Sequence, residues 1–405
     1  MPIGTIRDLG AEGKTVLLRL DLNSPIDPSS NIILDDKRFR EHLPTIHALD
    51  KSKVVIITHQ SRPGKKDFTT LEAHAEKLEQ LLGKPVTYVD SIFGRHAREA
   101  VHKMKPGEVV MLENVRFNAE ENLTLKPEEA KKTHLIKRLS TLGDVFVNDA
   151  FGTAHRSQPT VVGLPMTMRS AGGLLMEKEV FTLSKVFSGA PRPVCMVLGG
   201  TKVDDSIDVA RNVLDKGIAD TVIVIGVVAN VFLIAAGYDI GRPSTQLIAQ
   251  LKYQPEIEKA KEILGKYKDR VIMPQTVAVR ENNHRKEYPI TKIPPEDCPV
   301  LDIGMDAIHD MVGVLKKSGT VVFNGPAGLF EESDFATGTY EMIKAASKVD
   351  FSVVGGGHTA AVIEKMGLDG DFTHISTGGG ACIEFLTGKV LPAVDALEQS
   401  KKIFG

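Results

Sequence analysis

Basic side chains recur after hydrophobic runs in the first half of the chain. Four β-branched runs are followed, or ended, by segments that carry arginine or histidine: Arg19–Pro25, Thr58–Gly64, Glu113–Phe117 and Asp149–Arg156. In open parallel sheets, ligands bind outside the carboxyl ends of the strands. One arginine there is usually a solvated surface charge. Recurrence at four strand ends instead predicts an anionic small-molecule site, because clustered guanidinium groups repel one another unless an anion lies between them.

Glycine clusters occupy the corresponding positions in the second half. They are Gly199–Lys202, Asn324–Gly328, Gly355–Thr359 and Gly378–Gly380. One such cluster is explained equally well by a tight strand-to-helix turn. Four of them favour a polyphosphate ligand, because glycine lets backbone N–H groups approach phosphate oxygens at the start of a helix. Lys202 adds a full charge, whereas the spacing fits neither a P-loop nor a dinucleotide-binding fingerprint.

An anion site and a polyphosphate site in different halves favour phosphoryl transfer between two ligands. This chemistry depends on positioning and charge neutralisation more than on a covalent group. The sequence has no Ser-His-Asp ordering, H-E-x-x-H motif or activated cysteine. His59, His155 and His358 are candidate general bases, although spacing alone does not assign that role.

The scaffold predicted to hold these residues is an α/β fold. Short β-branched runs alternate with amphipathic helical segments, which is typical of parallel sheets with crossover helices. The predicted strands are Val16–Asp21, Lys53–Thr58, Val86–Val89, Val109–Leu112, Val145–Asn148, Val194–Leu198, Thr221–Ile225, Val271–Pro274, Thr320–Phe323 and Ser352–Val354.

Capping signals predict several of the helices. Thr69 and Glu72 have capping-box spacing, and Gly83 is placed to end that helix. A second helix is expected to start at Pro127 and to end at Gly143. One long helix is expected over Ala171–Gly189.

The length of 405 residues exceeds what one hydrophobic core usually supports, so two domains are expected. We predict two Rossmann-like, doubly wound parallel-sheet domains that are separated by a cleft and joined by a long helix. The expected bounds are an N-terminal domain over 1–168, the joining helix over 169–189 and a C-terminal domain over 190–389. The last segment, 390–405, is a short helix that can pack across the boundary between the domains.

Composition narrows the range of partners and locations. The 50 lysine and arginine residues balance 52 acidic ones, so the chain has no overall cationic field for nucleic acid or anionic lipid. Cys195, Cys298 and Cys382 lack disulfide or metal-ligand spacing, and the N-terminus lacks a signal-peptide pattern, which together predict a cytoplasmic protein. The apolar stretch Thr221–Gly237 fits a buried strand and helix better than a membrane span. A monomer and a homodimer both remain open.

Taken in order, these segments resemble the phosphoglycerate kinase family over nearly the whole chain. The most specific matches are Arg19–Pro25, Leu43–Ile46, His59–Pro63, Leu112–Phe117, Asp149–Arg156, Leu198–Val203, Asn324–Pro326 and Ser376–Gly380. The resemblance implies reversible phosphoryl transfer between 1,3-bisphosphoglycerate with ADP and 3-phosphoglycerate with ATP, in glycolysis and gluconeogenesis. It also implies Mg²⁺ as the cofactor.

The resemblance assigns roles to particular residues. It implies that 3-phosphoglycerate is held by Asp21, Asn23, Arg38, His59, Arg62, Arg116 and Arg156. It implies that the nucleotide is held by Gly199, Gly200, Lys202, Asn324, Glu331, Gly355, Gly356, Gly357, His358 and Thr359. The catalytic groups would be Arg38, Lys202, Gly357 and Gly380, and Asp205 would be the metal ligand.

At two positions, this chain departs from the common family pattern and resembles archaeal members instead. The family commonly has a lysine where this chain has Ser206, so one phosphate-stabilising charge is missing or supplied elsewhere. It commonly has an aspartate after the three glycines, where this chain has His358, which removes the usual metal-side carboxylate. Two other functions stay open from the sequence: another ATP-dependent kinase for a small acid, and a two-lobed anion-binding protein.

Overall fold

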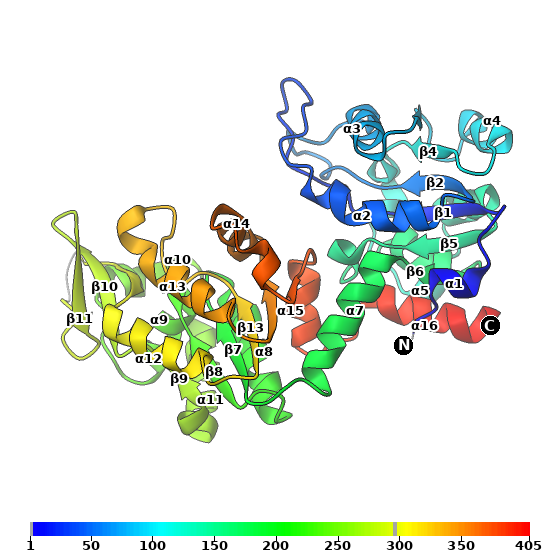
Figure 1. The fold of residues 1–405 in the computed structure, drawn as a ribbon. Helices are drawn as coiled ribbons and strands as arrows, with labels where there is room; N and C mark the ends of the chain where they lie inside the picture. The colour runs from blue at the N-terminus through cyan, green and yellow to red at the C-terminus, as the bar shows by residue number, and fades with distance from the viewer. Residues whose placement is uncertain (1–2, 295–297) are drawn as a thin grey trace. The chain divides into compact units, whose positions relative to one another are not determined.

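The chain forms two compact units in the computed structural model, which describes residues 3–294 and 298–405 (Figure 1). Unit 1 contains the residues up to Phe181 together with Val390–Gly405, and unit 2 contains Thr182–Lys389. Each unit is built around a six-stranded parallel sheet, so the predicted fold class is confirmed.

The sheet of unit 1 has the strand order β3-β4-β2-β1-β5-β6. Its strands are β1 (Thr15–Arg19), β2 (Lys53–Ile57), β3 (Val86–Val89), β4 (Val109–Leu112), β5 (Val145–Asn148) and β6 (Ser170–Gly172). The five strands predicted in this half are confirmed to within two residues at each end. Because β2 pairs with one side of β1 and β5 with the other, the segments that follow these three strands emerge next to one another.

Helices cover both faces of this sheet (Figure 1). Apolar residues of α1 (Ile6–Leu9), α2 (Lys37–Ala48) and α3 (Glu72–Leu82) pack on one face, where Phe39 and Leu78 meet Val16 and its neighbours. Residues of α4 (Arg95–Lys103) and α6 (His134–Leu139) pack on the other face around Leu17. The sheet is therefore doubly wound, with its core in two layers.

Two predicted helices differ from the observed ones: one starts at a different residue, and the other is interrupted. The N-cap of α3 is Leu71 rather than Thr69, and its backbone N–H donates to Glu113 Oε1 (3.1 Å). Gly83 ends this helix as predicted, with φ 65°. The helix expected from Pro127 to Gly143 is divided into α5 (Pro127–Ala130), α6 and a 3₁₀ turn, because Thr133 caps a new helix start by accepting from Ile136 N–H (3.3 Å).

The long helix α7 (Leu174–Phe187) is shorter than expected. Ser170–Gly172, which the sequence places in the helix, instead form β6 and pair with Phe146–Asn148. Gly172 permits this pairing, because a side chain there would come 2.8 Å from Ile3 Cδ1. The helix starts in unit 1 and ends in unit 2.

The C-terminal helix α16 (Pro392–Phe404) belongs to unit 1. Its Ala393 N–H donates to Ala154 O (3.0 Å), and Ser400 Oγ donates to Met168 O (3.1 Å). The chain therefore passes from unit 1 to unit 2 and back again.

The parallel sheet of unit 2 has the strand order β15-β14-β13-β7-β8-β9. Its strands are β7 (Val194–Leu198), β8 (Thr221–Val224), β9 (Val271–Ile272), β13 (Thr320–Asn324), β14 (Phe351–Gly355) and β15 (His374–Ile375). The five strands predicted here are confirmed, and β15 was not predicted. The chain order reverses between β7 and β13, which makes their carboxyl ends the switch point where ligands bind in such sheets.

The helices of unit 2 also lie on both faces of its sheet. Residues of α12 (Met305–Leu315), α13 (Thr337–Ala346) and α14 (Gly357–Lys365) pack with Val197 and Val321 in one core. On the other side, α8 (Val203–Asp215) contacts β7 and β8. The remaining helices are α9 (Gly226–Ala235), α10 (Arg242–Gln250), α11 (Gln254–Tyr267) and α15 (Gly380–Leu386).

The apolar stretch Thr221–Gly237 is a strand and a helix, β8 and α9, as predicted. Among the described residues, no helix combines the length and the hydrophobicity needed to cross a bilayer.

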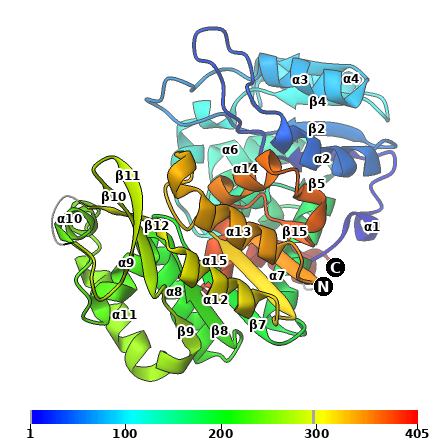
Figure 2. The same ribbon diagram turned by 60° about the vertical axis from the view of Figure 1, so that its left-hand side comes forward.

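A small antiparallel sheet in unit 2 was not predicted. It has the order β11-β10-β12 and comprises β10 (Thr276–Glu281), β11 (His284–Pro289) and β12 (Val300–Ile303) (Figure 2). Asn282 and Asn283 connect β10 to β11 with φ of 50° and 62°, the backbone of a two-residue hairpin turn. Val277 and Val279 pack against Leu233 of α9, which joins this sheet to the rest of the unit.

Candidate functional site

A polar cavity of about 800 Å³ lies in unit 1. It is lined by Asn23, Ser61, Arg62, Pro63, Lys65, Asp67, Arg116, Asn122, Arg156 and Gln158. Four of these were predicted to hold the acidic substrate: Asn23, Arg62, Arg116 and Arg156. They come from the segments after β1, β2, β4 and β5, so the parallel strands bring distant parts of the chain to one edge.

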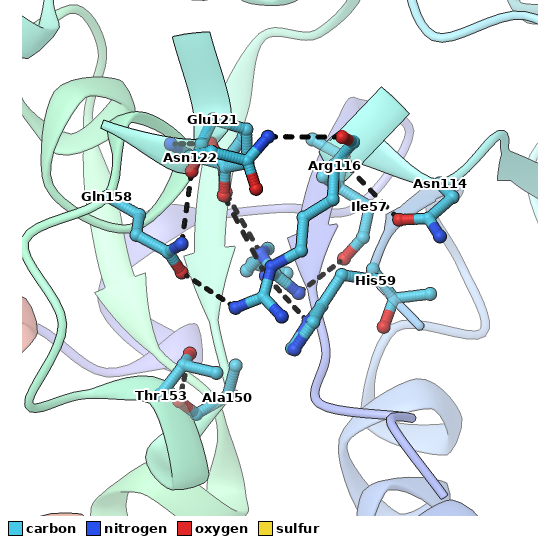
Figure 3. A network of polar contacts seen from close by, with 12 residues as sticks. Ile57, His59, Asn114, Arg116, Glu121, Asn122, Ala150, Thr153 and Gln158 are labelled. Carbon is cyan, nitrogen blue, oxygen red and sulfur yellow. Dashed lines mark hydrogen bonds and ion pairs between the residues drawn. The ribbon is translucent and has the colours of Figure 1, made fainter. Parts of the chain in front are cut away.

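The Arg116 guanidinium lies at the wall of this cavity and makes two hydrogen bonds, of which Figure 3 shows the one to Gln158. It donates to Ser61 O and to Gln158 Oε1 (3.3 Å), while Nε is buried without a partner among the described residues. Asn23 holds the same loop, because Asn23 Oδ1 accepts from Ser61 N–H (2.8 Å). Burial, together with the charges of Arg156 and Arg19, lowers the pKa of Arg116 to about 10. A bound anion would offset both the burial of Arg116 and its repulsion by neighbouring arginines, because a negative charge stabilises the charged guanidinium.

His59 is buried, and Figure 3 shows it beside Arg116. Its Nδ1 lies 3.1 Å from Arg19 Nη2. Because a guanidinium only donates, Nδ1 must accept, and the ring proton is therefore on Nε2. Burial first, and then the charges of Arg19, Arg116, Arg156 and Arg38, lower the pKa of His59 well below its usual value. The ring is thus a neutral hydrogen-bond donor at neutral pH.

Arg19, the basic residue of the first predicted strand end, is a member of this cluster to which the sequence assigned no role in binding. It is fully buried, donates from Nε to Thr160 Oγ1 (3.0 Å) and lies 4.0 Å from Glu121 Oε1. Glu121 also accepts from Thr160 N–H (2.9 Å), and burial raises the pKa of its carboxyl group. The only sequence signal was the place of Arg19 at the end of a buried strand, because Thr160 and Glu121 are distant in the chain.

Asp21 and Arg38 form an ion pair in unit 1 and do not line the cavity. Asp21 is buried, whereas 39% of the Arg38 side chain is exposed. Asp21 Oδ1 has no partner in the described part of the chain. Gly152 leaves room for this pair, since a side chain there would lie 2.2 Å from Asp21 Oδ2. An exposed arginine paired with a buried carboxylate can turn to another anion.

In unit 2, the loops after β7 and β13 approach each other without intervening side chains. Gly199 N–H donates to Asn324 O (2.7 Å), and Gly200 N–H donates to Pro326 O (2.8 Å). A side chain on Gly325 would lie 2.2 Å from Gly199 O, and its φ is 87°. This edge of the sheet therefore presents backbone atoms where unit 1 presents side chains.

The residues predicted to bind nucleotide lie at this edge or at the helix starts beside it. Gly199 and Gly200 follow β7, Asn324 ends β13, and Gly355 ends β14. The N-cap residues of α8 and α14 are Lys202 and Gly356. Gly357, His358 and Thr359 form the first turn of α14, and Gly380 begins α15.

Two of these side chains already have neighbours within the protein. Thr359 Oγ1 accepts from Gly325 N–H (3.0 Å), so it holds the loop after β13 in place. The His358 ring lies 6.1 Å from the Phe330 ring, measured between centroids. Asn324 Oδ1 is buried without a partner among the described residues.

A second pocket, of about 230 Å³, opens beside the glycine loops. Its walls are largely apolar and include Val277, Val300, Ile303, Leu329 and Phe330, with Glu331 and His358 among the polar lining residues. The antiparallel sheet supplies three of these apolar residues, which sequence reasoning missed. A slot with apolar walls and few polar groups is suited to a flat aromatic ring.

Asp205 lies in the first turn of α8 and is partly buried. Burial and the neighbouring Asp204 raise the pKa of its carboxyl group, and Lys202 and Lys389 oppose that shift. Within residues 3–294 and 298–405, no group of three or more histidine, cysteine or acidic side chains forms a ready-made metal site. Ser206 is fully buried, and its hydroxyl has no partner in the described chain.

The sequence pattern described as "Phosphoglycerate kinase" matches residues 6–389. The chain belongs to the phosphoglycerate kinase family. A phosphoglycerate kinase of Methanocorpusculum labreanum is 63% identical over 405 residues and is covered in full, as is this chain. "Phosphoglycerate kinase 2" of Methanosarcina acetivorans is 49% identical over 394 residues, 97% of this chain and 94% of that protein.

Solved structures agree with this membership. The crystal structure of phosphoglycerate kinase from Pyrococcus horikoshii OT3 matches with a TM-score of 0.91 at 42% identity, covering 98% of this chain and 99% of that one. The enzyme from Coxiella burnetii matches with a TM-score of 0.81 at 33% identity and the same coverage. The chain is therefore a phosphotransferase of glycolysis that uses ATP and ADP as co-substrates, with mainly archaeal relatives.

Proposed function

We propose that unit 1 binds 3-phosphoglycerate, that unit 2 binds the nucleotide, and that the phosphoryl group passes directly between them. The observation that carries this assignment is the cavity of unit 1, where three strand ends place Arg62, Arg116 and Arg156 around one space and a fourth supplies Asn23. A compact anion with several oxygens satisfies such a cluster, because each guanidinium can donate two parallel hydrogen bonds.

On the acceptor side, the basic residues around the cavity hold the phosphate and orient the carboxylate. His59 Nε2–H is a neutral donor at the base of the cluster. Asp21 Oδ1 is buried and without a partner among the described residues, so it can accept from the hydroxyl group of the substrate. Arg38 is proposed to turn from Asp21 toward the phosphoryl group in transit.

On the nucleotide side, the apolar slot holds the base, with Glu331 as a polar contact near the nucleoside. Lys202 and the backbone N–H groups at the start of α14 and around Gly380 hold the phosphates. Asn324 lies at the end of β13, and its Oδ1, which has no partner among the described residues, is available to the nucleoside.

The carboxylate of 3-phosphoglycerate is ionised near neutral pH, since carboxyl pKa values are about 3–4. No residue is therefore needed as a general base. Arg38, Lys202 and the N–H groups of Gly357 and Gly380 stabilise charge on the transferring group.

Mg²⁺ is the proposed cofactor. Among the described residues, no group of three or more candidate ligands could coordinate the ion by itself. The residues present therefore fit an ion that is coordinated largely by nucleotide oxygens, with the partly buried carboxylate of Asp205 at the start of α8 as the protein ligand. When bound, Mg²⁺ supplies charge neutralisation at the phosphates.

A coupled assay of ATP consumption, with and without 3-phosphoglycerate, tests the proposal. We expect turnover that requires this acid. A binding protein would show no turnover, and another small-acid kinase would not respond to it. The balance of charge favours small-molecule partners over nucleic acid or membrane. We also propose a cytoplasmic location, since Cys195, Cys298 and Cys382 are buried and none of them forms a disulfide in the described part of the chain.

A further inference from the structure

One face of α2 carries three polar side chains that contact separate parts of unit 1. Arg38, His42 and Thr45 are spaced four and three residues apart, so they share this face. Arg38 pairs with Asp21, and Thr45 Oγ1 accepts from Leu174 N–H (2.9 Å) at the start of α7. His42 lies between them and has no part in the phosphoryl transfer described above.

His42 is buried and joins two groups. Its Nε2 accepts from the backbone N–H of Asp21 (3.2 Å), and the ring proton is therefore on Nδ1. Nδ1 donates to Asp149 Oδ2 (2.7 Å). His42 thus fixes the backbone of Asp21, whose carboxylate holds Arg38.

Asp149 continues the chain of contacts to α7. Its second oxygen, Oδ1, accepts from Leu175 N–H (2.9 Å) and Met176 N–H (3.2 Å) in the first turn of that helix. Gly173 allows this approach, because a side chain there would come 2.2 Å from Asp149 Oδ1. Asp149 is fully buried, so these hydrogen bonds have no competition from solvent.

We propose that His42 is a positioning residue for the 3-phosphoglycerate site, and that it couples this site to the first turn of α7 through Asp149. The inference rests on the proposed binding of 3-phosphoglycerate by unit 1. When Arg38 exchanges Asp21 for the substrate, the backbone contact from Asp21 to His42 transmits the change to Asp149 and to the amides that it accepts.

The test measures 3-phosphoglycerate affinity by calorimetry in the full-length protein and in four variants. His42→Leu should weaken binding by about tenfold, because it leaves the buried Asp21 N–H and Asp149 Oδ2 without a partner. His42→Gln should recover much of the affinity, since an amide both accepts and donates. His74→Leu is the matched control: it removes another buried histidine of unit 1, which stacks on Phe39, and should leave the affinity within about twofold.

Arg62→Ala separates failure of this inference from failure of the site assignment. If Arg62→Ala binds 3-phosphoglycerate as well as the unchanged protein does, the proposed site is wrong. If Arg62→Ala loses affinity while His42→Leu retains it, the site stands and the positioning role is overturned.

Hydrogen exchange supplies a readout that a purely structural role would not alter. Adding 3-phosphoglycerate should change the exchange rates of the Leu175 and Met176 amides in the unchanged protein and in His42→Gln, but not in His42→Leu. A change that persists in His42→Leu overturns the coupling. Should His42→Leu fail to fold, His42→Asn provides a second test, because the shorter amide cannot contact both the Asp21 N–H and Asp149 Oδ2: the affinity should fall and the exchange response of Leu175 and Met176 should be lost, and an undiminished response would overturn the coupling.

Discussion

The two units present charge to their ligands in different ways. Unit 1 uses side chains, with Arg62, Arg116 and Arg156 around one cavity. Unit 2 uses backbone, with glycine loops in contact at the ends of β7 and β13. Charged side chains can shape a site to one compact anion, but their charges must be balanced where they are buried. Backbone N–H groups need only a close approach between loop and ligand. The first design is therefore sensitive to removing groups, and the second to adding them.

The largest effect is expected from removing a buried balancing charge in unit 1. Glu121→Ala leaves fully buried Arg19 without its carboxylate, which should lower the free energy of unfolding by about 3–5 kcal/mol. Glu128→Ala is the control, because its ion pair with Lys131 is largely exposed and should contribute below about 1 kcal/mol. Urea denaturation measures both. Similar losses of unfolding free energy in the two variants would mean that the stability of unit 1 does not depend on pairing its buried charges.

Arg38→Ala tests whether a side chain in unit 1 acts in the transition state. We expect kcat to fall on the order of 10²–10³-fold while KM for ATP changes little, as for loss of one donor to the reacting group. Arg40→Ala, at an exposed arginine two residues along α2 that pairs with Asp36, should retain normal kinetics. A raised KM for ATP as the main effect would place Arg38 in ground-state binding instead.

Gly325→Ala tests the backbone design of unit 2. The added methyl group would clash with Gly199 O, and a φ of 87° disfavours any side chain, so the two loops should move apart. We expect ATP binding to weaken by about tenfold, because a left-handed conformation costs a residue with a side chain about 1–2 kcal/mol. Gly265→Ala in α11 meets nothing within 4 Å and should leave ATP affinity unchanged. Calorimetric titration with ATP compares them. An unaffected Gly325→Ala protein would contradict the need for close approach.

The smallest effect concerns the metal. Asp205→Ala should raise the Mg²⁺ concentration needed for half-maximal rate, whereas His358→Ala should change it by less than about twofold, because Mg²⁺ prefers oxygen ligands. The position of His358 beside Phe330 agrees with a packing or phosphate contact. Activity titrations at fixed ATP distinguish the two variants. An equal shift in both would show that the histidine supports the ion.

The sequence predicted the features that depend on local pattern. Parallel strands follow from β-branched runs, and the rule that ligands bind at their carboxyl ends placed Arg62 and Arg116 at one edge. The close contact of Gly199 with Gly325 agrees with the glycine clusters. Strands β6 and β15 were missed because neither contains a β-branched run: β6 is Ser-Ala-Gly and β15 is His-Ile, whereas the equally short β9, Val-Ile, was predicted.

Features that depend on distant partners could not be predicted. Arg19 is buried because Thr160, 141 residues away in the chain, accepts from it. The tautomer of His59 follows from Arg19, and the apolar wall of the nucleotide pocket follows from where the antiparallel sheet packs. Each of these requires the tertiary structure, since neither residue type nor spacing encodes the contact.

The return of α16 to unit 1 has a consequence for the order of synthesis. Unit 2 is continuous in sequence, but unit 1 needs Val390–Gly405, which the ribosome makes only after unit 2. At about 5–20 residues per second, the first 181 residues wait roughly 10–40 s while unit 2 is synthesised. During that interval, the surface formed by η5 (Pro159–Gly163) and β6 that α16 later covers remains without its helix. The N-terminal part of the nascent chain is therefore the one that chaperones would need to protect, although it is made first.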